Sequence, residues 1–322
     1  MNRKNYIRER VTLQLFVIAV WAAIIGLIYI STIDVDFRSF FPLFAIVFFF
    51  YGFSMLFMII KDQFIGPAFE ILGAGFALVV PILVSTYLAM ALGFPLADAR
   101  LSAMDQALGF DWLAFITFVD SHPVLSRVLQ ESYLSFGPQL LMVPIILVAL
   151  GKIPRACAFI FGYGFLCFIS STISISYPAL GTYSVYGVAQ NDLQNINAHF
   201  GFFFLEDFNM VRTASSFVLK IDNTSGIITY PSVHAGVAFF IIWAMWDNRW
   251  TRWPFVVMNL LMAISAISHA NHYLVDIIAG AGIAAFTSAV ASYVFLGKRL
   301  IVWKWQPRQG KAQSSSFRIA DT

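Results

Sequence analysis

Two short polar stretches near the C-terminal end of the chain place serine, histidine and aspartate directly before hydrophobic runs. The first is "YPSVHAG" at residues 230–236, which carries Ser232 and His234, and the second is "HYLVD" at residues 272–276. On a helix, His272 and Asp276 would be separated by about 40° and would share one face. The carboxylate could then accept the ring N–H of the histidine, fix its tautomer and make the other nitrogen more basic.

These residue types suit chemistry on a phosphate group. The first turn of a helix presents unpaired N–H groups and the positive end of the helix dipole, and both attract an anion. Two histidines that face one phosphate can divide the reaction, because one attacks phosphorus while the other protonates the departing oxygen. The residues alone leave two alternatives open: a zinc site that includes His269, and a structural role as hydrogen-bond partners between helices.

The elements that position these residues are predicted to be transmembrane helices. Hydrophobic residues make up 59% of the 322 residues and charged residues only 11%, well below the roughly 25% charged residues of soluble domains. The hydrophobic runs predict eight spans. These spans cover residues 11–32, 39–60, 71–94, 128–150, 156–177, 231–247, 253–269 and 273–297. The sequence therefore predicts an all-α, polytopic integral membrane bundle of about eight transmembrane helices.

The distribution of basic residues predicts the orientation of this bundle. With a cytoplasmic N-terminus, 15 of the 20 Lys and Arg residues fall in cytoplasmic segments, as the positive-inside rule requires. The five outer basic residues are Arg38, Arg100, Arg127, Arg212 and Lys220. All five histidines lie at or near the outer face, namely His122, His199, His234, His269 and His272. We expect a multi-pass protein of a bacterial inner membrane, with both termini cytoplasmic and the reactive site facing the periplasmic or lumenal side.

Other features of the sequence complete the prediction of its organisation. The first span is longer than a signal-peptide core, so we expect it to remain in the protein. The net charge of +3 reflects topology and gives no reason to expect a nucleic-acid partner. Cys157 and Cys167 lie on one predicted span and are interpreted as packing residues.

Five segments are predicted along the chain. They are a basic cytoplasmic arm at 1–10, N-terminal transmembrane helices at 11–94, an outer amphipathic segment at 95–127, the main membrane domain at 128–297 and a cytoplasmic tail at 298–322. A second long outer segment, at 178–230, contains the aromatic stretch "HFGFFFLEDF" at 199–208. This stretch is either an interfacial helix that covers the bundle or a lid that grips a lipid substrate.

Together, "YPSVHAG" and "NHYLVDIIAG" resemble the second and third signature motifs of the type 2 phosphatidic acid phosphatase (PAP2) superfamily, P-S-x-H and S-R-x-x-x-x-x-H-x-x-x-D. The order of the motifs fits, as does the separation of the two histidines by 38 positions. The H-Y-x-x-D form is most similar to the subgroup of inositol phosphorylceramide synthase (aureobasidin-resistance-like proteins). The resemblance covers about residues 128–296. It implies that the bundle contains a six-helix phosphatase-type core and that residues 128–297 form the catalytic membrane domain.

The resemblance also implies a role for each residue that matches a motif. His272 would be the nucleophile that becomes phosphohistidine, and Asp276 would be the carboxylate that orients it. His234 would be the general acid for the leaving alkoxide. Ser232 would donate a hydrogen bond to the phosphate.

Two departures from the family pattern concern positive charge. A phosphoryl transition state needs positively charged groups close to its negatively charged oxygens. Ala266 follows Ser265 where the third motif has arginine. The first motif, K-x-x-x-x-x-x-R-P, is absent, and the uncharged "YPALGTY" at 177–183 occupies its place. We expect Arg212 and Lys220, in the outer loop before "YPSVH", to bind the phosphate instead.

The residues and the resemblance together predict a membrane enzyme that acts on a lipid phosphate and requires no metal or organic cofactor. If water resolves the phosphohistidine, the protein is a lipid phosphatase, which is the first expectation. If the hydroxyl of a lipid resolves it, the protein is a phosphotransferase that moves a phospho-head group such as inositol phosphate. A further alternative is a non-catalytic lipid-binding or transport protein. The partners expected are the lipid substrate and the bilayer.

Overall fold

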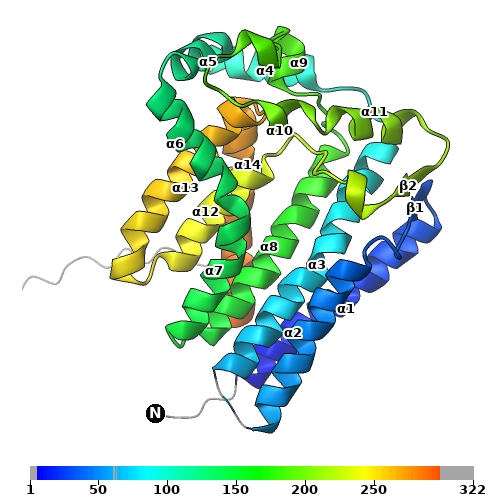
Figure 1. Ribbon diagram of the computed structural model, residues 1–322, viewed down its shortest axis with the longest axis vertical. Coiled ribbons are helices and arrows are strands. Elements are labelled where there is room, and N and C mark those ends of the chain that lie inside the picture. Colours follow the sequence, from blue (N-terminus) through cyan, green and yellow to red (C-terminus); the bar gives the residue numbers. More distant parts are fainter. Residues whose placement is uncertain (1–5, 61, 63, 298–322) are drawn as a thin grey trace, which may run out of the picture.

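The computed structural model describes residues 6–60, 62 and 64–297, which fold into a helical bundle with two very short strands (Figure 1). The bundle is built from α1 (Ile7–Tyr29), α2 (Phe41–Ile59), α3 (Ile65–Ala91), α6 (Pro123–Leu134), α7 (Phe136–Ala149), α8 (Ile153–Ser174), α12 (Val233–Met245), α13 (Arg249–His269) and α14 (Leu274–Leu296). The shorter elements are β1 (Ile33–Val35), α4 (Asp98–Ala107), α5 (Trp112–Asp120), α9 (Thr182–Tyr186), η1 (Gln190–Asp192), α10 (His199–Phe202), α11 (Leu205–Thr213), β2 (Phe217–Leu219) and η2 (Ile221–Asn223). The predicted tail at 298–322 and half of the predicted arm, residues 1–5, lie outside the described residues.

Helical segments occupy all eight predicted spans. Among the described residues, six helices are long and apolar enough to cross a membrane, namely α1, α2, α3, α8, α13 and α14. The prediction of an all-α polytopic membrane protein is therefore confirmed. The remaining two predicted spans depart from straight helices of membrane length.

The predicted span at 128–150 is a bent pair of helices. α6 and α7 meet at a break around Ser135, where the helix direction changes by 54°. Pro138 accounts for the break, because it lacks the N–H that would bond to the carbonyl of Leu134 four residues earlier. The hydroxyl of Ser135 adds to the distortion by donating to the carbonyl of Ser132 (2.6 Å). Hydropathy measures the length of such a segment and does not register its bend.

The predicted span at 231–247 contains α12, which is only 13 residues long. A helix of this length rises about 20 Å, less than the roughly 30 Å of a hydrocarbon core. Pro231 and Ser232, which precede the helix, are buried. α12 therefore begins inside the protein rather than at an exposed end.

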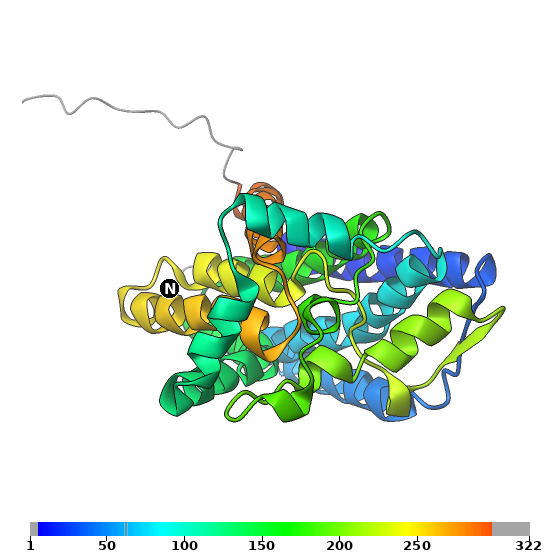
Figure 2. The ribbon, with the colours of Figure 1, turned by 90° about the horizontal axis from the view of Figure 1, so that it is seen from above.

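Short helices cover the end of the bundle at which α12 and α14 begin (Figures 1 and 2). The predicted outer amphipathic segment forms α4 and α5, which are separated by Gly109 in a left-handed conformation (φ 75°). Asp111 then caps α5 by accepting the N–H of Ala114 (3.0 Å). β1 and β2 pair in parallel, with Ile33 opposite Phe217. These three-residue strands are too short for an alternating pattern to predict them.

α3 and α8 form the buried centre of the bundle. Much of the length of both helices is buried, whereas α1 and α2 leave most of their apolar side chains exposed. Such exposure is expected of helices that face lipid, where an apolar surface carries no penalty. Cys157 and Cys167 on α8 are buried free thiols, in keeping with their interpretation as packing residues.

Candidate active site

α12 and α14 approach each other closely where both helices begin. The N–H of Ser232 donates to the carbonyl of Asp276 (3.2 Å). A Cβ atom on Gly280 would lie 2.5 Å from the carbonyl oxygen of Ser232 and 2.9 Å from the amide nitrogen of Gly236. Glycine is required at position 280 because any side chain there would collide with the backbone of α12. This close packing brings the two polar stretches together.

Ser232 is the N-cap residue of α12. Its hydroxyl oxygen accepts the N–H of Ala235 (3.3 Å), which is a common use of serine at a helix start. The side chain is fully buried and is not one of the residues that line the cavity next to the histidines. The structure thus gives Ser232 a capping contact, and its predicted hydrogen bond to phosphate stays a prediction.

His234 is held between two aromatic rings at the bend between α6 and α7. The ring of Tyr133 stacks on the imidazole with centroids 4.3 Å apart and planes 13° apart. The ring of Phe136 lies 4.4 Å away, measured between centroids. These contacts restrain the plane of the imidazole, and therefore the directions in which its two nitrogens point.

His272 and Asp276 form the hydrogen bond that their spacing predicts. Nδ1 of His272 and Oδ2 of Asp276 are 3.0 Å apart, and the N–H of Tyr273 donates to the same oxygen (3.0 Å). The local structure differs from the prediction in one respect, because His272 lies in the loop before α14 and only Asp276 lies within the helix. With the proton on Nδ1, the lone pair of Nε2 is available to attack an electrophile.

Burial is the main electrostatic influence on His272. It lowers the pKa of the imidazole to about 4, while the backbone of Thr229 acts in the opposite direction. Burial favours the neutral form because charge is poorly solvated away from water. His272 is therefore neutral at pH 7, as a nucleophile must be.

Asp105 on α4 supports this arrangement and was missed by sequence reasoning. Its fully buried carboxylate accepts the N–H of Leu274 (2.8 Å) and the N–H of Val275 (2.9 Å). Burial raises the pKa of Asp105, and the two amide donors partly offset that rise. A carboxylate at the first turn also interacts favourably with the helix dipole. Asp105 thus fixes the start of α14, which carries Asp276.

Asp98 lies two turns before Asp105 on α4 and anchors the neighbouring loop. Its carboxylate accepts the N–H groups of Leu180 (2.9 Å) and Gly181 (2.8 Å), together with the hydroxyl of Tyr273 (3.0 Å). The loop belongs to the uncharged "YPALGTY" segment. The one signal in the sequence is the seven-residue spacing of the two acids, which places both on one face of a helix.

The expectation that both helix starts offer free N–H groups applies to only one of them. The first three N–H groups of α14 are occupied, two by Asp105 and one by the carbonyl of Tyr273. At the start of α12, the N–H groups of Val233 and His234 have no hydrogen-bond partner within the described part of the chain. α12 is therefore the helix start that can bind an anion.

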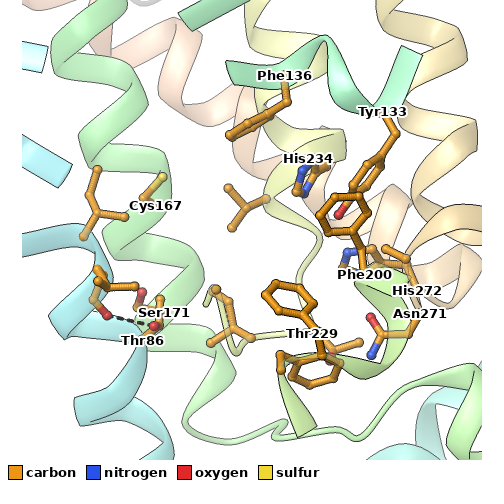
Figure 3. Close-up of a pocket in the computed structure, with 18 of the residues that line it drawn as sticks. Thr86, Tyr133, Phe136, Cys167, Ser171, Phe200, Thr229, His234, Asn271 and His272 are labelled. Atoms are coloured by element: carbon orange, nitrogen blue, oxygen red, sulfur yellow. Dashed lines mark hydrogen bonds between the residues drawn. The ribbon is translucent and has the colours of Figure 1, made fainter. Parts of the chain in front are cut away.

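A cavity of about 380 Å³ lies between α3, α8, α12 and the α6–α7 bend (Figure 3). Its lining includes His234, His272 and Asn271, which contribute nitrogen and oxygen atoms to an otherwise mainly apolar wall. The two histidines, which are far apart in the sequence, thus face one space. Among residues 6–60, 62 and 64–297, no Lys or Arg lines this cavity.

The aromatic stretch at 199–208 contributes part of the cavity wall. Phe200, Phe203 and Phe204 line the cavity, and the ring of Phe200 lies 5.2 Å from that of Tyr133, measured between centroids. This placement favours the interpretation that the stretch shapes a substrate site, because a simple surface helix would leave the histidines uncovered.

Arg212 and Lys220 lie away from the two histidines. The guanidinium of Arg212 donates to the carbonyl of Phe94 (2.7 Å) and lies 5.1 Å from the ring centroid of Phe208. Lys220 is exposed at the end of β2. Neither side chain lines the cavity. A contact of either residue with phosphate would therefore require a rearrangement of the outer loop.

His269 does not join the other histidines. Its Nδ1 lies 3.0 Å from the hydroxyl of Ser268, and its Nε2 lies 3.5 Å from the hydroxyl of Ser126. Within the part of the chain that the structure describes, no three His, Cys, Asp or Glu side chains are grouped closely enough to hold a metal ion. The residues present therefore offer a histidine–aspartate pair and a second histidine rather than a set of zinc ligands.

Comparison with protein-family models matches residues 99–290 to the PAP2 superfamily. The matched segment spans more than half of the chain and contains both polar stretches, together with Asp105 and the rest of α4 after its first residue, Asp98. No curated protein and no solved structure matches the chain.

Proposed function

Because the chain belongs to the PAP2 superfamily, whose members are generally phosphoesterases, we propose that it hydrolyses a lipid phosphate ester at the outer leaflet through a phosphohistidine. The observation that carries this proposal is the bond between His272 and Asp276 (3.0 Å) at the edge of a cavity that His234 also lines. One histidine is oriented by a carboxylate and the other is not, which matches the unequal roles of nucleophile and acid.

The first step transfers the phosphoryl group to the protein. Nε2 of His272 forms a bond to phosphorus while the bond between phosphorus and the lipid oxygen breaks. The protonated imidazole of His234 gives its proton to that oxygen, so a lipid alcohol leaves. The negative charge of the bound phosphate favours protonation of His234 beforehand. Asp276 stabilises the positive charge that develops on His272.

The second step restores the protein. Water attacks phosphorus, gives its proton to His234, and the bond between phosphorus and Nε2 breaks to release phosphate. The three phosphate oxygens need donors throughout. The N–H groups of Val233 and His234 supply such donors at the start of α12, where no described cation lines the cavity.

The test is phosphate release from a panel of lipid phosphates by the purified protein, with and without a strong metal chelator. We expect release that persists in chelator and is abolished in the variant His272→Ala. Release that is lost on chelation and restored by zinc would contradict the mechanism. If a lipid phosphate binds but no lipid is turned over, the protein is a lipid-binding protein instead.

Transfer to a lipid hydroxyl is the second candidate, and the burial of the site favours it. Only 5% of His272 is exposed, and four phenylalanines line the cavity. Exclusion of water is what a transferase needs, since water competes with the acceptor. Hydrolysis stays ahead because it requires no second lipid site. A labelled phospholipid donor supplied with candidate hydroxyl lipids distinguishes the two, since transfer places the label in a new lipid and hydrolysis releases it into water.

A further inference from the structure

A second, almost wholly apolar pocket of about 590 Å³ lies between α3, α7 and α8. Its walls include Phe76 on α3, Leu140 on α7 and Ile160 on α8. Tyr163 carries the one polar side chain among its lining residues in the described structure. We refer to this space as the α3–α7 groove. One phenol among apolar side chains is a poor match for a charged head group.

The α3–α7 groove lies next to the cavity that holds the two histidines. Val79 and Tyr163 line both spaces. The two neighbouring spaces therefore place nitrogen-bearing side chains at one end and hydrocarbon walls at the other. A ligand that matches both ends must carry a polar group on an apolar chain.

The groove also opens laterally, toward the lipid-facing surface of the bundle. Three of its lining side chains are substantially exposed, namely Val79 (38%), Leu141 (44%) and Met142 (53%). Gly137 follows the α6–α7 bend, and a Cβ atom built on it would meet no atom within 4 Å. The wall of the groove is therefore open at Gly137, on an apolar surface that faces the bilayer.

We propose that the α3–α7 groove binds an acyl chain of the lipid substrate while its phosphate group reaches His272 and His234. This inference rests on the proposed function and adds the position and direction of the substrate. One wall of the groove comes from α3, which precedes the segment matched to the family, residues 99–290. The proposed acyl-chain site is thus formed jointly by the N-terminal helix α3 and by helices of the matched region.

The groove would act on selectivity more than on affinity. An acyl chain in the bilayer is already in an apolar medium, so its transfer to an apolar groove changes its solvation little. What the groove supplies is position, because a chain held between α3 and α7 directs the attached phosphate into the cavity. The phosphate of a substrate without an acyl chain would not be positioned in this way.

The first test is photo-crosslinking with a phosphatidic acid that carries a diazirine near the end of one acyl chain, followed by mapping of the modified peptides. We expect crosslinks in α3 around Val79 and in α7 around Leu141. An excess of unlabelled phosphatidic acid should compete for them, and an excess of diacylglycerol should compete less. The readout needs no turnover, so it applies equally to His272→Ala. Crosslinks confined to other helices would overturn the inference.

The second test narrows the groove. Gly137→Leu places a side chain in the empty space, and Leu141→Trp narrows the rim without altering the residue before Pro138, where backbone strain could disturb folding. The matched control is Gly26→Leu on α1, where a Cβ atom also meets nothing within 4 Å. We expect the ratio of kcat/KM for long-chain phosphatidic acid to kcat/KM for a water-soluble phosphate ester to fall about tenfold or more in both groove variants. Gly26→Leu should leave the ratio unaltered.

The outcomes separate this inference from the proposed function. An unaltered ratio in both groove variants, with wild-type folding, would overturn the groove as a chain site while the phosphatase activity stands. Competed crosslinks in α3 and α7 without any phosphate release would support the groove and remove the proposed function.

Discussion

At the residue scale, the charge of Asp276 is what makes the orienting hydrogen bond useful to the reaction. The carboxylate accepts from Nδ1 of His272 and balances the positive charge that the ring acquires on attack. In Asp276→Asn the side chain keeps its size but loses this charge and can hold the wrong tautomer. We expect kcat to fall about 10³- to 10⁴-fold, with little change in the melting temperature.

Steady-state kinetics and thermal unfolding in detergent check this prediction. Asp34→Asn, at an exposed position on β1, is the matched control and should have wild-type kinetics. Activity of Asp276→Asn within a few-fold of wild type would show that the carboxylate does not orient the nucleophile.

Asp105 provides a prediction about positioning rather than chemistry. Its two oxygens accept the N–H groups of Leu274 and Val275. Asparagine offers one acceptor, so one buried amide is left without a partner, at a cost of about 1–3 kcal/mol in unfolding free energy. Because the start of α14 would shift, we expect kcat to fall about 10- to 100-fold while KM changes little.

A positioning role also predicts that Asp105→Glu, which keeps both oxygens, restores more activity than Asp105→Asn at equal protein stability. A variant that loses stability but keeps kcat would assign Asp105 a purely structural role. The spacing of Asp98 and Asp105 places both acids on one helix face, but the sequence does not identify the partners of Asp105, which are backbone amides 169 and 170 positions away. Contacts of that kind depend on tertiary structure alone.

At the scale of elements, the packing of α12 against α14 depends on Gly280. A Cβ atom there would lie 2.5 Å from the carbonyl oxygen of Ser232, so Gly280→Ala must push the helices apart. Overpacking of this kind costs about 1–3 kcal/mol. It also separates His234 from His272, so activity should fall together with the melting temperature.

Gly282→Ala, two residues further along α14, is the matched control, because a Cβ atom on Gly282 meets nothing within 4 Å. Alanine there should leave activity intact and raise helix stability by up to about 1 kcal/mol. Equal behaviour of the two variants in thermal unfolding and phosphate release would contradict the importance of the α12–α14 contact.

The helices themselves were largely predictable from the sequence, and the departures have local causes. Hydrophobic length located all eight segments, since each backbone group in a bilayer must be paired within a helix. The bend at Pro138 and the short length of α12 escaped prediction, because hydropathy averages over a window and ignores single prolines. The motif spacing identified His234, His272 and Asp276, whereas Arg212 and Lys220 were chosen by sequence proximity and lie outside the cavity.

At the scale of the whole molecule, the excess of basic residues on one side predicts which end of the bundle faces the cytoplasm. Both histidines of the cavity lie at the opposite end. Single cysteines replacing Ser216 and Arg249, which are both exposed, should react with a membrane-impermeant reagent from opposite sides. The background carries alanine at Cys157 and Cys167. Reaction of both positions from the same side would contradict the eight-segment topology, and reaction with the two sides exchanged would place the cavity in the other leaflet.

The central claim is that one lipid phosphate passes through a covalent bond to His272. The most direct measurement is to mix the protein with a phosphate-labelled lipid, quench within the first turnover and map the labelled peptide. We predict label that is stable to alkali, labile to acid and located on the peptide containing His272, and we predict none in His272→Ala. Rapid phosphate release with no label on that peptide, or full activity in His272→Ala, would contradict the account.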